Sequence, residues 1–182
     1  MADDIRDFEI EGMSIGDSLL NYVNKITINT SRMYEYNDDK FYTIDLILDN
    51  FENYDAVQIH LKKNDQQFKI YGIGGAMQFG EPGKYFPQSI KDCKKQMNII
   101  ENHIDKIFID ADKRSAQLVG QGDYDPEAVR DEIYYTIDNG QIYLQCVTWG
   151  KAIKKKEYLF DNLRLTLLNI EFYNWLDNEA WE

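Results

Sequence analysis

Apolar residues recur along the chain with two different periods, which separate helices from strands. Between residues 90 and 108 they follow a helical period, with lysine and acidic residues between them, and Ser89 stands where an N-cap is expected. The same period predicts a helix over about residues 15–25, preceded by Ser14, and another that begins near Asn169. The sequence thus predicts about three helices.

Strand-like runs occupy much of the remaining chain. They cover residues 41–48, a hairpin over residues 57–73, a second hairpin over residues 132–149, and residues 163–167. The second hairpin contains Asn139-Gly140, which predicts a type I′ turn with positive φ angles. Glycines 72, 74 and 75 predict a frayed or bulged end of the first hairpin.

The order of these elements indicates the fold class. The strands come as hairpins and do not alternate one by one with helices, which favours an antiparallel sheet with helices packed on it. We therefore expect a single α+β domain over residues 1–182. Residues 110–131 are polar and acidic, and we expect them to form a long loop.

Charge narrows the set of partners. The chain has 182 residues, with 32 acidic and 20 basic side chains and a formal net charge of -12. Such a charge repels nucleic acid and anionic lipid, so neither a nucleic acid nor a membrane is expected as a partner. Residues 1–60 hold 13 acidic and 4 basic side chains, and this region would orient a basic partner toward itself.

Cysteine usage and the N-terminus bear on the compartment. The first residues are charged and lack the apolar stretch of a secretory signal, and no run is long enough to span a membrane. Cys93 and Cys146 lie in a predicted helix and a predicted strand, so we expect two buried thiols in a reducing, cytoplasmic environment, with a disulfide between them as the alternative.

Residues 12–16 match the G-x-S-x-G pattern of a hydrolase nucleophile elbow. That motif requires a sheet and an oxyanion loop upstream, yet only eleven residues precede Gly12. The spacing of Ser14 and Asp17 instead favours a helix cap. His60 and His103 are the two histidines that can act as a base, and we expect both at the surface or its boundary.

Metal and phosphate motifs fail on spacing. Asp123, Asp125 and Glu127 begin like a calcium loop, but Ala128 replaces the required glycine. We therefore expect an ordinary acidic loop, and a looser cation site formed by these three residues is the less favoured alternative. The histidines and cysteines lack metal-ligand spacing, and the glycines after residue 71 do not complete a phosphate-binding pattern. The sequence predicts neither a metal nor a cofactor.

Aromatic residues in the second hairpin are the candidate binding site. They are Tyr134, Tyr135, Tyr143 and Trp149, which populate both faces of the hairpin. Such residues form ligand surfaces because their rings combine a large apolar area with a polar group. Packing within a sheet also favours aromatic residues, so the pattern fits a core as well.

Several segments also resemble an uncharacterised family of small marine-bacterial proteins. The resemblance rests on the opening DFEIEGMSIGDSLLNY (residues 7–22), the hairpin at residues 54–75, a Cys-bearing helix, and the closing FDNLRLTLLNIEFYNWL (residues 160–176). It covers most of the chain. It implies no activity, cofactor or catalytic residue.

The leading functional expectation is a non-enzymatic soluble protein that binds a protein or a small ligand. One alternative is a small hydrolase that uses Ser14, or carboxylates of the acidic loop with His60. Another is an acidic mimic of nucleic acid that blocks a basic protein site, although no stripe of evenly spaced carboxylates is present.

Overall fold

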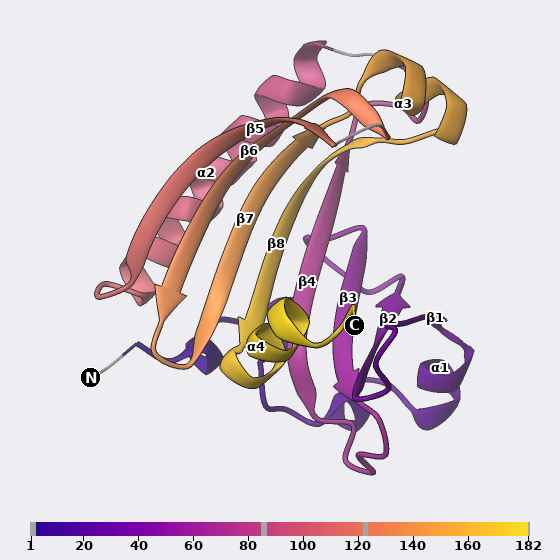
Figure 1. Cartoon of the computed structure of the whole chain (residues 1–182), viewed down its shortest axis with the longest axis vertical. Coiled ribbons are helices and arrows are strands. Elements are labelled where there is room, and N and C mark those ends of the chain that lie inside the picture. Colours follow the sequence, from indigo (N-terminus) through magenta and orange to yellow (C-terminus); the bar gives the residue numbers. More distant parts are fainter. Residues whose placement is uncertain (1–2, 85–86, 122–123, 182) are drawn as a thin grey trace.

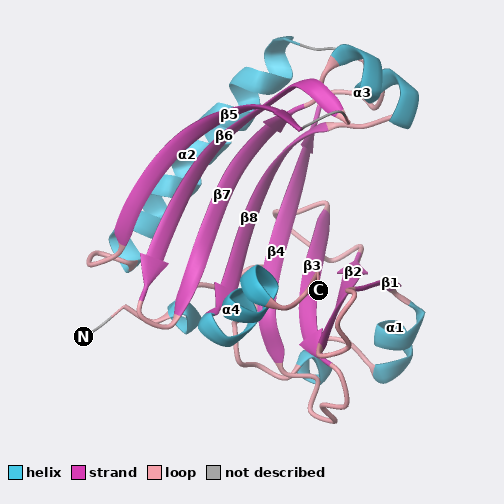
Figure 2. Cartoon of the chain, viewed as in Figure 1, coloured by secondary structure: helices cyan, strands magenta, loops and turns pink. Residues whose placement is uncertain are grey.

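The computed structural model describes residues 3–84, 87–121 and 124–181 and contains one strongly curved sheet with helices on both faces (Figure 1, Figure 2). Every strand pairing is antiparallel, in the order β1-β2-β3-β4-β8-β7-β6-β5. The strands are β1 (Arg32–Glu35), β2 (Phe41–Leu46), β3 (Ala56–Lys62), β4 (Ile70–Phe79), β5 (Asp112–Gln121), β6 (Asp125–Ile137), β7 (Gly140–Thr148) and β8 (Asp161–Asn169).

The described residues also form four α-helices and two short 3-10 helices. They are η1 (Ile5–Asp7), η2 (Leu19–Asn21), α1 (Lys25–Thr30), α2 (Pro87–Ile107), α3 (Lys151–Glu157) and α4 (Ile170–Asn178). The predicted α+β class is confirmed. No helix in the described ranges is both long and apolar enough to cross a membrane.

One face of the sheet, which we call the covered face, packs against α2 and the N-terminal segment. Alternate residues of the strands point to this face, and Leu163, Leu165 and Leu167 of β8 are all fully buried there. The helix contributes Cys93, Met97 and other residues of its apolar stripe. Full burial of such a side chain contributes about 1.5–3 kcal/mol. This face therefore holds the main core.

The opposite face, which we call the open face, carries the shorter helix α4. Figure 1 shows α2 behind the sheet and α4 in front, across the lower parts of β8 and β4. Asn169 caps α4 through its side chain, as expected for a helix that begins there. Phe172 and Trp175 are buried against Phe41 and Leu168. This second, smaller core occupies only one end of the face.

The helix predicted over residues 15–25 is absent. Gly12 and Gly16 adopt positive φ angles of 75° and 93°, and Ile10 and Met13 pair across a tight turn. Gly16 then donates its N–H to the carbonyl of Ile70, which ties the segment to the start of β4. Both glycines of the G-x-S-x-G string thus serve turns, where a left-handed φ favours glycine.

The acidic loop predicted over residues 110–131 is also wrong, because the described part of this region forms β5 and most of β6. Residues 112–120 of β5 are almost all exposed, since β5 lies at the edge of the sheet. An exposed edge strand needs no alternation of apolar and polar residues, and its sequence looks like a loop. Gly120, with a φ of 82°, marks the register shift between the two strands.

Two smaller predictions fail in detail. The hairpin of β6 and β7 is present, yet neither Asn139 nor Gly140 has a positive φ, so its turn is not type I′. Asn139 instead accepts the N–H of Ile5 through its side chain, at 3.0 Å. The glycines of β4 accompany a register shift opposite His60, as expected, but the strand continues to Phe79.

A buried polar cluster joins α2, α3 and β8 at the upper end of the molecule. Ser89 is not an N-cap but lies inside α2, where its hydroxyl donates to the Asp161 carboxylate at 2.6 Å. Lys154 of α3 donates to the same oxygen at 2.6 Å, and its side chain is 2% exposed. Lys154 and Asp161 thus form a buried ion pair, in which neither charge is left without a partner.

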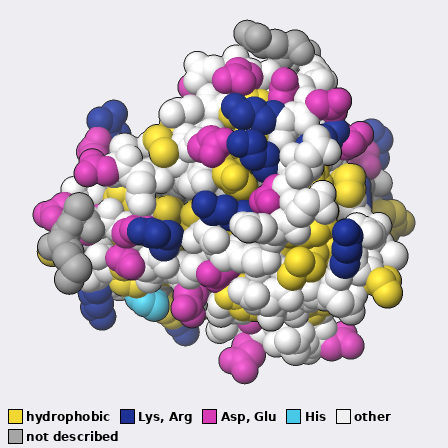
Figure 3. Space-filling view, turned by 90° about the horizontal axis from the view of Figure 1, so that it is seen from below, with side chains coloured by type: hydrophobic (Ala, Val, Ile, Leu, Met, Phe, Trp, Pro, Cys, Tyr) yellow, Lys and Arg dark blue, Asp and Glu magenta, His cyan; other side chains and the backbone are white. Residues whose placement is uncertain are grey.

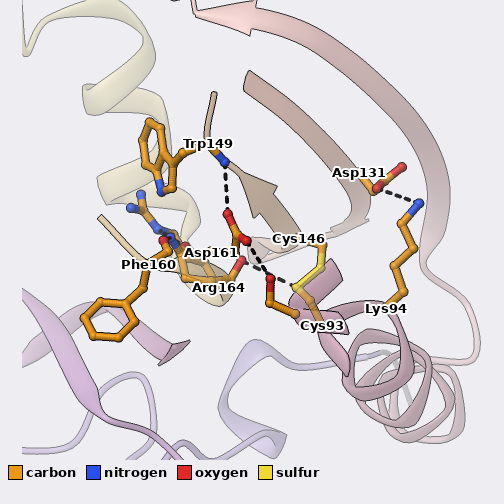
Figure 4. Close-up of a disulfide and its surroundings, with 10 residues drawn as sticks. Cys93, Lys94, Asp131, Cys146, Trp149, Phe160, Asp161 and Arg164 are labelled. Carbon is orange, nitrogen blue, oxygen red and sulfur yellow. Dashed lines mark hydrogen bonds and ion pairs between the residues drawn. A yellow bond between two sulfur atoms is a disulfide. The ribbon is translucent and has the colours of Figure 1, made fainter. Parts of the chain in front are cut away.

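Cys93 and Cys146 form a disulfide that links α2 to β7 (Figure 4). Both residues are buried, as predicted, and their Cα atoms lie 6.0 Å apart. The expectation of two free thiols is therefore wrong. The two positions face one another because Cys93 lies on the apolar stripe of α2 and Cys146 points to the covered face.

Candidate functional site

The upper half of the open face is the candidate functional site. There the strands run between α4 and α3, and none of the described helices covers this part of the face (Figure 1). Consecutive residues of β8 show the division, because Leu163 and Leu165 are buried whereas Arg164 between them is exposed. The strand therefore contributes to a core and to a surface at once.

Small residues of β4 form the floor of this surface. Gly74 pairs with Thr166 and Ala76 pairs with Arg164 in the adjacent strand β8. A Cβ atom on Gly74 would lie 3.2 Å from the Thr166 hydroxyl oxygen, so a larger residue would crowd that side chain. A cavity of about 270 Å³ lies above this floor.

A second cavity, of about 260 Å³, lies beside α4. Tyr143 and Gln145 of β7 line it together with Tyr173 and Leu176 of α4. Thr166 lines both cavities, which places them next to one another along β8. The two cavities together form a trough on the open face, with an apolar end at the helix and a polar end toward Arg164.

Asp45 of β2 closes the trough on the side of β1 and β3. One carboxylate oxygen accepts the Tyr34 hydroxyl at 2.7 Å, and the other accepts the side-chain amide of Gln58 at 3.0 Å. The pKa of Tyr34 is raised, mainly by burial of its hydroxyl and to a smaller extent by the hydrogen bond to Asp45. Both carboxylate oxygens are thus already engaged on the trough's acidic side.

Two arginines, Arg164 on β8 and Arg130 on β6, lie on the other side of the trough, with β7 between their strands. Arg164 donates through Nε to the side-chain oxygen of Asn162 at 2.9 Å. Arg130 of β6 lies 3.2 Å from the carboxylate of Glu132, whose side chain is only 2% exposed. Gln145, which pairs with Arg164 across the strands, donates to that same carboxylate at 2.8 Å.

Electrostatics distinguish Arg164 from the other side chains of this group. The pKa of Arg164 is lowered, mainly because the surrounding protein desolvates its guanidinium group and to a smaller extent because Arg130 repels it. Asp45 has the opposite effect on this pKa. Its side chain is nevertheless exposed, because it stands in a depression that is open to solvent. Burial raises the pKa of Glu132, against the effects of Arg130 and Gln145.

The structure separates the four aromatic residues that the sequence nominates. Tyr134 and Tyr143 share the open face, with ring centroids 5.4 Å apart in an edge-to-face contact. Tyr135 points the other way, is 1% exposed, and donates its hydroxyl to Asp105 of α2 at 2.8 Å. Trp149 follows the end of β7 at the top of the trough, where its backbone N–H donates to Asp161.

The functional residues that the sequence does not reveal are those between the apolar positions of β8. The leucines of residues 163–167 predict the strand, and the residues between them, Arg164 and Thr166, face away from the core. An arginine in the centre of a sheet is the one signal in the sequence that points to this surface. The missing information is which neighbouring strands surround it.

The hydrolase residues do not meet. The Ser14 hydroxyl contacts the carbonyl oxygen of Phe8 at 3.5 Å, and its backbone N–H donates to Asp17. His60 is buried beneath α4, contrary to its expected surface position, and stacks on Phe172 with ring centroids 4.5 Å apart. Its Nδ1 lies 2.7 Å from the Thr43 hydroxyl. The serine packs with the covered face, and His60 lies on the open face.

The residues of the looser cation site serve the backbone instead. Asp125 is buried, and its two oxygens accept the N–H groups of Glu127 at 3.2 Å and Gly150 at 2.8 Å. Asp123 lies outside the described residues. Over the described ranges, no group of three or more histidine, cysteine or acidic residues is arranged to hold a metal.

The acidity of the N-terminal third gathers around another cavity, of about 520 Å³. Asp7, Glu9, Glu11 and Glu52 line it, together with His103 of α2. Both carboxylate oxygens of Glu11 accept backbone N–H groups of residues 52–54, so this acid fastens a loop. On the face seen from below, acidic and basic side chains are interspersed (Figure 3).

Comparisons with known proteins give no relative from which a role can be transferred. No protein-family model matches the chain, and searches of curated proteins and of solved structures give no significant match. The resemblance to small marine-bacterial proteins stays a prediction.

Proposed function

We propose that this protein is a non-enzymatic binding protein that holds a small ligand in the trough of the open face. The observation that carries the proposal is the unequal cover of the sheet, since α2 extends along one face and α4 covers only the lower part of the other. Concave surfaces with apolar walls and a few placed polar groups are the usual form of small-ligand sites.

The lining of the trough supports a ligand that has both apolar and polar parts. Tyr143 and Leu176 offer apolar contacts near α4, while Gln58 and Thr166 offer hydrogen-bonding groups farther along. Gly74 and Ala76 leave the floor low enough for a ligand to lie between β3 and β8. The surface lacks an arrangement of nucleophile and base, which is why binding is proposed and not catalysis.

A screen of neutral, water-soluble fragments by two-dimensional NMR tests this function. We expect the bound fragments to shift the backbone amide signals of Tyr143, Gln145 and Thr166. Ala76→Phe fills the trough without removing a polar group and should weaken these fragments at least tenfold. Ala152→Phe, on the exposed surface of α3, is the matched control and should leave their affinity unchanged.

The screen can also contradict the proposal. Fragments that gather in the acidic cavity near His103, or that bind Ala76→Phe as well as the natural chain, would exclude the trough as the ligand site. A cytoplasmic location is a separate proposal, supported by the scarcity of cysteines, two in 182 residues, and opposed by the disulfide between them. Titration of thiols in protein taken from its native host tests it, because a reducing compartment keeps Cys93 and Cys146 reduced.

A further inference from the structure

The upper end of the trough contains a positive charge that the protein itself does not neutralise. Arg6, Arg114 and Arg130 each lie within 3.2 Å of a carboxylate oxygen. Among the described residues, Arg164 and the exposed Arg32 have no carboxylate within ion-pair distance, and Arg164 is the one of the two that lies in the trough, where its hydrogen bond is to the neutral side chain of Asn162. In a chain with a net charge of -12, an unpaired arginine in a depression is unexpected.

A further donor close to this position also lacks an acceptor. The indole Nε1 of Trp149 is buried and has no hydrogen-bond acceptor within the described ranges, whereas the Nε of Arg130, also buried, lies 3.2 Å from the Glu132 carboxylate without forming a hydrogen bond to it. Figure 4 shows Trp149 and Arg164 in the same part of the molecule, near Asp161, to which Trp149 donates its backbone N–H. The strand register agrees, since Arg164 reaches along β8 to Asn162, which pairs with Val147, two residues before Trp149.

Buried donors without acceptors cost free energy, and like charges held close together add to that cost. One oxyanion would relieve both, because its oxygens accept several N–H groups and its charge offsets that of the unpaired Arg164. The planar guanidinium group suits carboxylate and phosphate in particular, since it offers parallel N–H donors. Nε of Arg164 is engaged by Asn162, which leaves the terminal N–H groups for a ligand.

We propose that the trough binds a small molecule through a carboxylate or phosphate group held by Arg164, with the indole N–H of Trp149 as a further donor. This inference rests on the proposed function and assigns the chemical class of its ligand. The anionic group lies at the Arg164 end, and the rest of the molecule extends over Thr166 toward Tyr143 and α4. Asp45 and Glu132 do not compete for the site, because each carboxylate already has partners within the protein.

The three tryptophans provide a direct test by NMR, because each indole N–H gives its own signal. Inorganic phosphate, added at millimolar concentration, should move the Trp149 signal in a saturable way. The Trp175 indole donates to Asp38 and should not move, nor should that of Trp181, which is exposed. Sodium chloride of equal ionic strength is the reference for general salt effects.

Two small molecules that differ only in their charge measure what a carboxylate group contributes to binding, and phosphate alone measures what a phosphate group contributes. We expect 4-hydroxybenzoate to bind at least tenfold more tightly than neutral 4-hydroxybenzamide if carboxylates are accepted, and phosphate alone to bind if phosphates are. Arg164→Gln should abolish the phosphate response and make the two benzoyl probes equal. Arg114→Gln, at the exposed edge of the sheet, should behave like the natural chain.

The failures of the two proposals differ. If phosphate and 4-hydroxybenzoate leave the Trp149 signal in place, or if Arg164→Gln responds like the natural chain, the anion site does not exist, although neutral fragments can still bind beside α4. If neutral fragments also miss the trough, the proposed function fails as well. An unchanged Trp175 signal in Arg164→Gln verifies that the variant is folded.

Discussion

The covered and open faces of this sheet use the same strands for opposite purposes. On β8, Leu165 is fully buried against the α2 side, while its neighbour Thr166 is partly exposed in the trough. The covered face contains closely packed apolar side chains, and the upper open face contains glycine, alanine, arginine and hydrogen-bonded polar residues. Stability and the proposed ligand binding are therefore assigned to opposite faces by the alternation of side chains along a strand, and we expect that each can be changed without the other.

The largest effect is expected from the disulfide of the covered face. Its closure of a 53-residue separation corresponds to about 4 kcal/mol of stability in the chain-entropy model. Urea denaturation with and without a reducing agent should show a loss of this size, and Cys93→Ser with Cys146→Ser should make the protein insensitive to the reductant. Two reactive thiols in the native, unreduced protein would show that the bond does not form.

Neighbouring substitutions on β8 compare the faces directly. Leu165→Ala should lower the free energy of unfolding by about 2–5 kcal/mol, because it leaves a cavity beneath α2. Thr166→Ala removes a partly exposed hydroxyl and should cost about 1 kcal/mol or less. Chemical denaturation measures both. Equal losses would mean that the open face is as tightly packed as the covered face.

His60 makes the small core under α4 sensitive to acid. Burial lowers its pKa to about 3, whereas an unfolded chain has a histidine pKa near 6.5. The unfolded state therefore binds the proton first, and stability, complete above about pH 6.5, should fall by about 1.4 kcal/mol per unit as pH drops toward 5. The raised pKa of Glu132 acts in the opposite direction and reduces this slope.

Denaturation at several pH values checks this slope. His60→Gln should remove most of it, and His103→Gln, on the exposed side of α2, should keep it. The ring of His60 also explains Gly72, because a Cβ atom there would lie 2.6 Å from Cδ2 of the imidazole. If both variants retain the acid sensitivity, the acidic side chains and not His60 are responsible.

The smallest effect on stability is expected at the proposed anion site. Arg164→Gln removes a partly desolvated charge that Arg130 repels, so the free energy of unfolding should change by about 0.5 kcal/mol or less, or rise. A loss of several kcal/mol would instead assign Arg164 to the fold. The control is Arg114→Gln, which removes an exposed ion pair with Asp112 and should also be nearly neutral.

Much of the fold follows from sequence patterns where burial is one-sided. Helix α2 and the hairpins were predictable because their apolar residues keep a clear period. Strand β5 was not, since an exposed edge imposes no pattern, and the helix after Ser14 was not, since pairing with the start of β4 overrides local propensity. Neither error changes the predicted α+β class, because the remaining hairpins and helices already specify it.

The candidate site was less predictable than the fold. The aromatic pattern selected Tyr134 and Tyr143, which lie on the open face, but it also selected Tyr135, which lies in the main core. Arg164 is a candidate site residue because of its surroundings, which include Arg130, Asp45 and Trp149 from other strands and their ends. Such a group depends on the strand order, and the order depends on contacts between distant segments.

The position of β8 also has a consequence for how the chain acquires its structure. Strands β1–β4 form one antiparallel meander and β5–β7 another, and β8 alone joins them, because it pairs with β4 on one side and with β7 on the other. Because β8 is synthesised after all the other strands, neither meander can gain its central neighbour until β8 has emerged from the ribosome. The sheet should therefore be completed only at that point, with the two free sheet edges exposed to aggregation until then.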